Sequence, residues 1–305
     1  MDAPRPRPLK VGLLLSTGDR WDGSTATWTE ILASAQLAEA IGFDSVWIGD
    51  HLLMQFPPNP PIGIWDGWSM LAAIAATTSR VELGPLVSCT AYRNPALLAK
   101  MAATVDEISG GRLILGLGAG WHEPEFRAFG YPFDHRVGRF EEALTIITTL
   151  LRTGEIDFEG RYYQARACEL RPRGPRPDGV PIMVGGGGDR MLRLTARHAD
   201  IWNRDFAPTG SIAELRELQA KVDVVCREAG RTPQTLDRYA AVAIDLPGGA
   251  RPEGFGALSG SPEQLADSLR EYAAGGISHV QLWLEPANLA AIETFASTLE
   301  VLDRA

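Results

Sequence analysis

The sequence predicts an α/β fold, a (β/α)8 TIM barrel that forms a single domain over residues 1–305. Three observations favour this fold. Short apolar runs alternate with amphipathic stretches along the whole chain, glycine follows the last turn of most of these stretches, and no linker-like segment interrupts the alternation. Eight strand–helix pairs suit a closed barrel. A doubly wound open sheet has the same alternation, and periodicity alone does not exclude it.

The expected strands are short runs that are apolar on both faces, as in a parallel sheet covered by helices. They occupy residues 10–16, 45–49, 81–88, 112–117, 181–184, 201–203, 238–245 and 279–284. The expected helices occupy residues 27–41, 65–78, 95–108, 139–152, 190–198, 212–229, 262–274 and 289–302. Two helix starts are well marked. Asn94 precedes a first-turn proline, and Ser261 and Gln264 have the spacing of a capping box.

Two segments depart from this alternation and are expected as insertions after the fourth and seventh strands. Residues 155–178 contain an alternating stretch typical of a hairpin, followed by a Pro/Arg-rich stretch. Residues 247–260 are rich in glycine and proline and follow the seventh strand. Loops after barrel strands border the active site, so this second segment is interpreted as a mobile lid or as a plain surface loop.

Composition and charge narrow the classes of function. The 305 residues carry a net charge of −9, and the arginines are scattered. Because nucleic acid and anionic membranes bind basic surfaces, neither is expected as a partner. Three widely spaced cysteines without a CxxC motif disfavour a disulfide framework or a zinc site and suit a reducing cytoplasm. The apolar run at 11–16 is too short for a signal peptide, and no run approaches the roughly 20 residues of a membrane helix.

Two glycine-rich turns follow expected strands. The first, at 116–120, differs from the dinucleotide fingerprint because its third glycine comes one residue early and Pro124 follows where a long helix should begin. We interpret it as a strand end that lets a flat group approach the backbone. The second turn is four glycines, 185–188, before an expected helix. Free N–H groups there predict a site for a phosphorylated cofactor, and a flexible connector is the alternative.

Polar side chains also follow the expected strands. Asp50 and His51 end the second strand, and the near-neutral pKa of imidazole suits acid–base chemistry, so His51 is the candidate catalytic residue. A capping aspartate beside a packed histidine is the alternative. His122 lies in a polar loop after the fourth strand and is expected to be solvated. Three further histidines are expected to be structural: His135, His198 and His279.

Other catalytic classes are less well supported. The sequence has no HxH, HExxH or GxSxG motif, so neither a metal site nor a serine hydrolase is expected. Glu123 or Glu125 could pair with Asp245 as glycosidase carboxylates across the barrel mouth. The composition does not reject that pairing, but the glycine turns make it unnecessary.

Four segments carry a resemblance to a known family: residues 38–52, 81–100, 111–144 and 181–203. With them the chain resembles, over nearly its whole length, the bacterial luciferase-like superfamily of flavin- and deazaflavin-dependent barrel oxidoreductases. The segments GAGWHEPE (118–125) and FDHRVGR (133–139) favour the subgroup that uses coenzyme F420.

The resemblance implies an F420-dependent oxidoreductase that moves hydride between the deazaflavin C5 and an organic substrate. The alternative is a monooxygenase that uses reduced flavin mononucleotide (FMN) from a partner reductase together with O2. A cofactor-binding barrel without catalysis is a third hypothesis. The resemblance also implies a homodimer.

The resemblance further assigns individual residues. It places His51 near the reactive ring and a non-prolyl cis peptide at Leu86–Val87 behind the ring. The implied cofactor-binding residues are Asp50, His51, Leu86, Val87, Ser88, Cys89, Ala119, Gly120, Trp121, Val184, Gly185, Gly186 and Gly187. The substrate is expected beside Trp65, Trp121 and His122, under the loop 247–260.

One departure concerns the substrate. Some deazaflavin dehydrogenases of the family carry a tryptophan four residues after the histidine and a glutamate in the fourth-strand loop. Here those positions hold Gln55 or Phe56, and Trp121. The sequence therefore does not predict a sugar-phosphate dehydrogenase.

Overall fold

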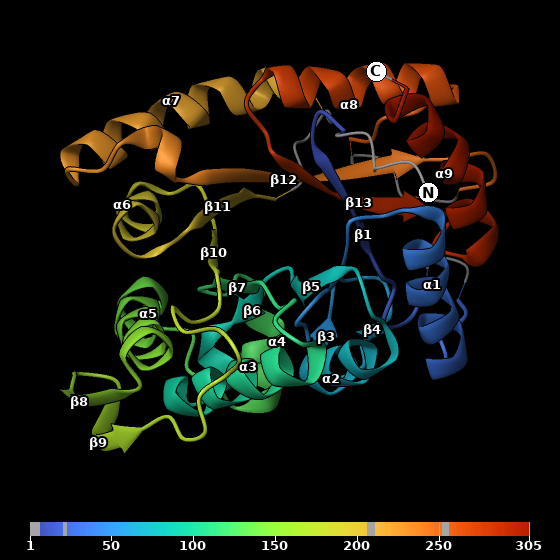
Figure 1. The fold of residues 1–305 in the computed structure, drawn as a ribbon. Helices are drawn as coiled ribbons and strands as arrows, with labels where there is room; N and C mark the ends of the chain where they lie inside the picture. The colour runs from blue at the N-terminus through green and yellow to red at the C-terminus, as the bar shows by residue number, and fades with distance from the viewer. Residues whose placement is uncertain (1–6, 21–22, 206–210, 250, 252–255, 305) are drawn as a thin grey trace.

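A nine-stranded parallel sheet forms the centre of the protein (Figure 1). The computed structural model describes residues 7–20, 23–205, 211–249, 251 and 256–304. In spatial order the strands are β5 (Glu82–Pro85), β2 (Ser45–Ile48), β1 (Lys10–Leu14), β13 (His279–Glu285), β12 (Asp237–Asp245), β11 (Ile201–Arg204), β10 (Ile182–Gly185), β7 (Leu115–Gly118) and β6 (Ser88–Cys89).

The sheet closes on itself to form a barrel. Leu83 of β5 forms a parallel bridge with Leu113, just before β7, and its N–H donates to the Arg112 carbonyl oxygen at 3.1 Å. The two strands β5 and β6 are halves of one barrel strand, separated by Leu86 and Val87. The nine strands therefore fill eight barrel positions, so the (β/α)8 prediction is confirmed and the open-sheet alternative is wrong.

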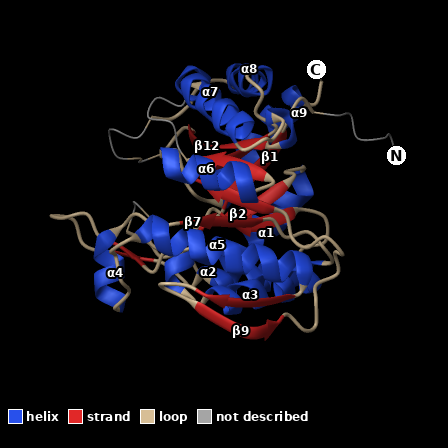
Figure 2. Ribbon diagram, turned by 90° about the vertical axis from the view of Figure 1, so that its left-hand side faces the viewer, coloured by secondary structure: helices blue, strands red, loops and turns tan. Residues whose placement is uncertain are grey.

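Helices surround the barrel on all sides (Figures 1 and 2). They are α1 (Trp28–Ile41), α2 (Gly67–Thr77), α3 (Pro95–Ser109), α4 (Glu123–Phe129), α5 (Arg136–Thr153), α6 (Asp189–His198), α7 (Ile212–Glu228), α8 (Pro262–Ala274) and α9 (Leu289–Leu302), with short 3-10 turns at Thr90–Tyr92 and Pro233–Thr235. The start of α8 is the capping box predicted at Ser261, and Asn94 caps α3 through its side chain. Gly42 ends α1 with φ 100°, a value that favours glycine.

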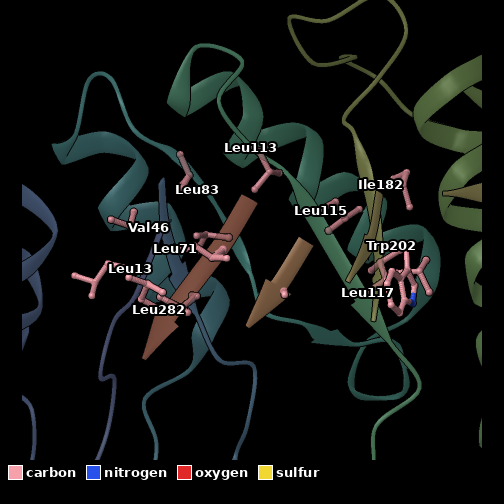
Figure 3. Packing of buried hydrophobic residues seen from close by; sticks show 14 of the residues in the cluster. Leu13, Val46, Leu71, Leu83, Leu113, Leu115, Leu117, Ile182, Trp202 and Leu282 are labelled. Atoms are coloured by element: carbon pink, nitrogen blue, oxygen red, sulfur yellow. The ribbon is translucent and has the colours of Figure 1, made fainter. Parts of the chain in front are cut away.

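Two packed layers of apolar side chains result. Residues that point outward from the strands pack beneath the helices. Figure 3 labels six of them, each at most 2% exposed: Leu13, Val46, Leu83, Leu115, Ile182 and Leu282. Residues that point inward form a second cluster, which includes Trp47, Met183 and Tyr239. The Trp47 and Tyr239 rings meet edge to face at 6.4 Å. The barrel interior is thus filled below its mouth.

Three excursions interrupt the alternation. The hairpin predicted within 155–178 is confirmed as β8 (Glu155–Glu159) and β9 (Gln164–Glu169), which lie beside α5 (Figure 1). A further short pair, β3 (Leu53–Met54) and β4 (Ile62–Gly63), follows β2 and was not predicted.

The third excursion is the loop after β12, for which a mobile lid and a plain surface loop were both considered. Residues 250 and 252–255 of this loop lie outside the described residues, so the lid stays a prediction. Leu258 forms a parallel bridge with Ile244 and ties the end of the loop to β12. Within the described residues, no helix is both long and apolar enough to cross a membrane.

Candidate active site

A histidine–glutamate pair lies at the carboxyl ends of the barrel strands. His51 follows β2, and Glu125 lies on α4, which follows β7. The His51 Nδ1 is 2.9 Å from Glu125 Oε1, and the His51 side chain is 25% exposed. A carboxylate accepts only, so Nδ1–H is the donor and the tautomer is fixed. The opposite ring nitrogen, Nε2, is then available to accept a proton or, once protonated, to donate one.

Glu125 is ionised although it is buried. Its side chain is 1% exposed, and its Oε2 accepts hydrogen bonds from the N–H groups of Leu52 at 2.9 Å and Leu53 at 3.4 Å. Burial alone would raise the pKa of Glu125, but hydrogen bonds from His51, Tyr92 and Leu52 outweigh burial and hold that pKa below its ordinary value. The pair therefore places a fixed negative charge behind the imidazole.

Asp50, at the end of β2, bonds to neighbouring segments of the protein rather than to His51. Its side chain is 1% exposed. It accepts from the Ser88 hydroxyl at 2.6 Å and the Cys89 N–H at 3.2 Å, and Arg93 binds both of its oxygens at 2.7 and 2.9 Å. Arg93 also contacts Asp66, the N-cap of α2, at 3.0 Å. Asp50 and Ser88, predicted as cofactor contacts, hold β2, β6 and α2 together. Burial raises the pKa of the Cys89 thiol to about 12, so this side chain is uncharged.

A non-prolyl cis peptide joins Leu86 to Val87, as the resemblance implied. Here Val87 faces the glycines of β7 and β10. A Cβ on Gly118 would lie 2.7 Å from Val87 Cγ2, and a Cβ on Gly185 would lie 3.3 Å from both Val87 methyl groups. The glycines at 116–120 were expected to leave space for a flat ligand. The side chain that actually occupies the space beside Gly118 is that of Val87.

The segment Ala119–Trp121 leads from β7 to α4. Ala119 packs against the main hydrophobic core. Gly120 has φ 76°, and a Cβ there would lie 2.5 Å from the Phe126 ring and 2.7 Å from Cys89 Sγ. Two reasons therefore favour glycine at this position: the left-handed backbone conformation and the lack of space for a side chain.

The second glycine turn leads from β10 into α6. Gly186 has φ 139°, and Gly188 is the N-cap of α6, where a Cβ would meet no atom of the described residues within 4 Å. Within the described residues no side chain caps this helix. Open space thus lies in front of uncapped N–H groups, an arrangement that suits a phosphate. Val184 is fully buried in the core and lies behind this opening.

An exposed aromatic surface adjoins the histidine. Trp121 is 56% exposed, and its ring centroid lies 5.7 Å from that of His51 at an interplanar angle of 76°. The Phe56 ring, 39% exposed, stacks on Trp121 with centroids 6.3 Å apart and an angle of 24°. We call Phe56 and Trp121 the aromatic platform.

His122 lies beneath the aromatic platform, and the prediction that it is solvated is wrong. It is 5% exposed, its ring lies 5.0 Å from Trp121 and 5.1 Å from Phe56, and its Nε2 accepts the Gln55 N–H at 2.8 Å. Burial lowers its pKa, so the ring is neutral. Trp65, also predicted to contact substrate, is 48% exposed and donates its indole N–H to the Ala26 carbonyl oxygen at 2.8 Å.

The remaining histidines lie away from this pair. His279 is inside the barrel, with Nε2 2.7 Å from Ser45 Oγ, and burial lowers its pKa to about 3. His135 precedes α5 and is exposed, and His198 ends α6. Asp245, considered as a glycosidase carboxylate, pairs with Arg251 at 2.7 Å. In the part of the chain that the structure describes, no group of three or more His, Cys, Asp or Glu side chains could hold a metal ion.

Fold and site together define a class of protein, the (β/α)8 barrels whose polar groups gather at the carboxyl ends of the strands. Within this class, the chain belongs to the luciferase-like monooxygenase family, whose family model matches residues 9–245. The family resemblance found in the sequence is therefore confirmed.

Similar proteins include enzymes of two kinds. The chain is 30% identical over 214 residues to a 5,10-methylenetetrahydromethanopterin reductase of Archaeoglobus fulgidus, a match that covers 69% of this chain and only 59% of the reductase. It is 28% identical over 260 residues to the pyrimidine monooxygenase RutA of Cronobacter turicensis, a match that covers 78% of this chain and 68% of RutA. The solved structure of an F420-dependent secondary alcohol dehydrogenase, in complex with an F420–acetone adduct, has the same fold, with a TM-score of 0.82 and 20% identity. The match covers 96% of this chain and 99% of the dehydrogenase.

Proposed function

We propose that this protein is a coenzyme F420-dependent oxidoreductase that transfers hydride between the deazaflavin C5 and an organic substrate. The observation that carries the proposal is the His51–Glu125 pair, which follows β2 and β7, the two barrel neighbours of the strand that holds the cis peptide. The family membership and the likeness in fold to an F420-dependent alcohol dehydrogenase support it.

The residues at the mouth suit such a cofactor. The uncapped start of α6 offers N–H groups to a phosphate, and the open space at Gly188 leaves room for it. Val87 and the small residues of β7 and β10 would lie beside the ring. Reduced F420 supplies a hydride when it is bound.

The chain itself would supply the proton. Protonated His51 Nε2 would donate to the oxygen of a carbonyl substrate, or neutral Nε2 would accept from an alcohol in the reverse direction. Glu125 would stabilise the imidazolium and hold the ring in position, since its carboxylate is fixed by Leu52 and Tyr92. Glu125 would thus act as a positioning residue and His51 as the catalytic one.

The second candidate is an FMN-dependent monooxygenase. The similarity to a pyrimidine monooxygenase favours it, and the open glycine turn would accept the FMN phosphate equally well. A partner reductase would then deliver the reduced flavin. In either case we propose a cytoplasmic homodimer that acts on a small molecule, and light scattering of the purified protein tests the dimer.

The test is anaerobic oxidation of reduced F420 with a panel of ketones, aldehydes, imines and enones. His51→Asn should reduce kcat/KM by about 100-fold or more, because general acid–base catalysis contributes about 10²–10⁴-fold. Glu125→Gln keeps a hydrogen-bond acceptor but removes the negative charge behind the imidazole, so it should lower kcat/KM less than His51→Asn does. Turnover that is unchanged in His51→Asn would contradict the proposal. Oxygen uptake with reduced FMN, without any F420 oxidation, would favour the monooxygenase.

A further inference from the structure

The aromatic platform exposes two large apolar side chains beside the candidate catalytic histidine. Phe56 and Trp121 are exposed at 39% and 56%, next to the partly exposed His51. The two rings stack on each other at an interplanar angle of 24°, and the part of each ring that stays exposed is available to a ligand. Adjacent exposed aromatic side chains beside a partly exposed polar group are typical of a ligand-binding surface.

The aromatic platform is held in place from below. His122 is buried under both rings, and its Nε2 accepts the N–H of Gln55, the residue before Phe56. This hydrogen bond ties the chain after β2 to the chain after β7. The platform is therefore part of the folded structure before any ligand binds, which reduces the entropy lost on binding.

Among the described residues, the charged groups around the aromatic platform already have partners, and Arg136 donates to the Gly120 carbonyl oxygen beside Trp121. The buried imidazole of His122 is occupied as an acceptor. Glu125 pairs with His51 at 2.9 Å, and Glu123 pairs with Arg127 at 2.9 Å. A phosphate or carboxylate near this surface would thus have to compete with Glu125, Glu123 or the Gly120 carbonyl oxygen for a cation, and its lost hydration would be replaced only in part.

We propose that the aromatic platform is a substrate subsite and that it selects an uncharged carbonyl compound with a planar aromatic ring next to the reacting carbon. This inference rests on the proposed function, because it assigns the carbonyl oxygen to His51 Nε2. The Trp121 ring centroid is 5.7 Å from the His51 ring, so one aryl ketone can reach both. Offset stacking favours a planar ring over a puckered ring of equal size.

The experiment compares acetophenone with cyclohexyl methyl ketone, which differ mainly in ring planarity, and includes glucose 6-phosphate as a charged probe. Dissociation constants are measured by ligand-observed NMR on the full-length protein, with and without F420. Acetophenone should bind at least fivefold more tightly than cyclohexyl methyl ketone, and glucose 6-phosphate should bind more weakly than either.

Variants then locate the selectivity. Trp121→Leu and Phe56→Leu should each weaken acetophenone binding at least threefold and change cyclohexyl methyl ketone binding less than twofold. Trp121→Phe should retain most of the preference. Phe129→Leu is the matched control, since Phe129 is 53% exposed at the last position of α4. These side chains are exposed, so the variants should fold, and urea unfolding checks that they do.

Equal affinity for the two ketones, an unchanged preference in Trp121→Leu, or tighter binding of glucose 6-phosphate would overturn the inference. F420 binding to the wild-type protein is measured separately. If F420 binds and the aryl preference is absent, the inference about the aromatic platform fails alone. If the preference is present and F420 does not bind, the proposed function fails and the subsite stands.

Discussion

Gly118→Ala tests whether the glycine that ends β7 is needed to admit the Val87 side chain. The new Cβ would lie 2.7 Å from Val87 Cγ2, about 1 Å inside the ordinary carbon–carbon contact of about 3.5–4.0 Å. Overpacking of this kind costs about 1–3 kcal/mol. We therefore expect Gly118→Ala to lower the free energy of unfolding by about 1–3 kcal/mol in urea titrations followed by circular dichroism.

A double-mutant cycle identifies the cause of this loss. Val87→Ala removes the methyl group that would clash, so Gly118→Ala should cost less than about 0.5 kcal/mol in that background. Gly84→Ala is the control. Its Cβ would lie 2.2 Å from the Ile114 carbonyl oxygen, and Val87 is not among its nearest contacts, so Val87→Ala should not change its cost. Additive costs of Gly118→Ala and Val87→Ala, with equal m-values, would refute the reasoning.

Three further predictions concern pH, the glycine turn and the buried ion pair. Burial lowers the pKa of His279 from 6.5 to about 3, so between these values the unfolded chain binds a proton that the folded chain does not. This group should therefore cost about 1.4 kcal/mol of stability per pH unit as pH falls below 6.5; a His279→Gln variant with the same pH slope in urea unfolding would contradict this. Gly188→Asp should cap α6 and weaken F420 binding at least tenfold, because a carboxylate would occupy the expected phosphate position; unchanged affinity by calorimetry would remove the phosphate from this turn. Arg93→Met should cost about 3–5 kcal/mol by leaving the Asp50 charge buried without its main partner, and Asp50→Asn in the same background should recover part of that loss; if it recovers none, the ion pair is not the cause.

Much of the fold follows from the sequence alone. The apolar runs were long enough and the glycine stops regular enough to place eight strands and the helices between them, and the caps of α3 and α8 depend on local residues only. The pair β3–β4 was missed because each strand has two residues, too few for an alternation to be visible. The break between β5 and β6 is invisible in composition, and only the family resemblance implied it.

The candidate site was predicted less completely, because its geometry depends on contacts between distant segments. His51 was identified from its place after a strand. Its partner Glu125 was noted only as a glycosidase carboxylate, since 74 residues separate the two in sequence. His122 looked solvated in a polar loop, but the fold places Phe56 and Trp121 over it. A buried polar group is defined by what covers it, and sequence spacing does not show that.

F420 dependence is tested most directly by an equilibrium titration of the cofactor-free protein with F420 and with FMN, followed by fluorescence. The proposed function predicts saturable binding of F420 that is at least tenfold tighter than binding of FMN, and predicts that Gly188→Asp weakens it. Tight binding of FMN alone would contradict F420 dependence and assign the His51–Glu125 pair to oxygen chemistry. Binding of neither cofactor would contradict the interpretation of the glycine turn itself.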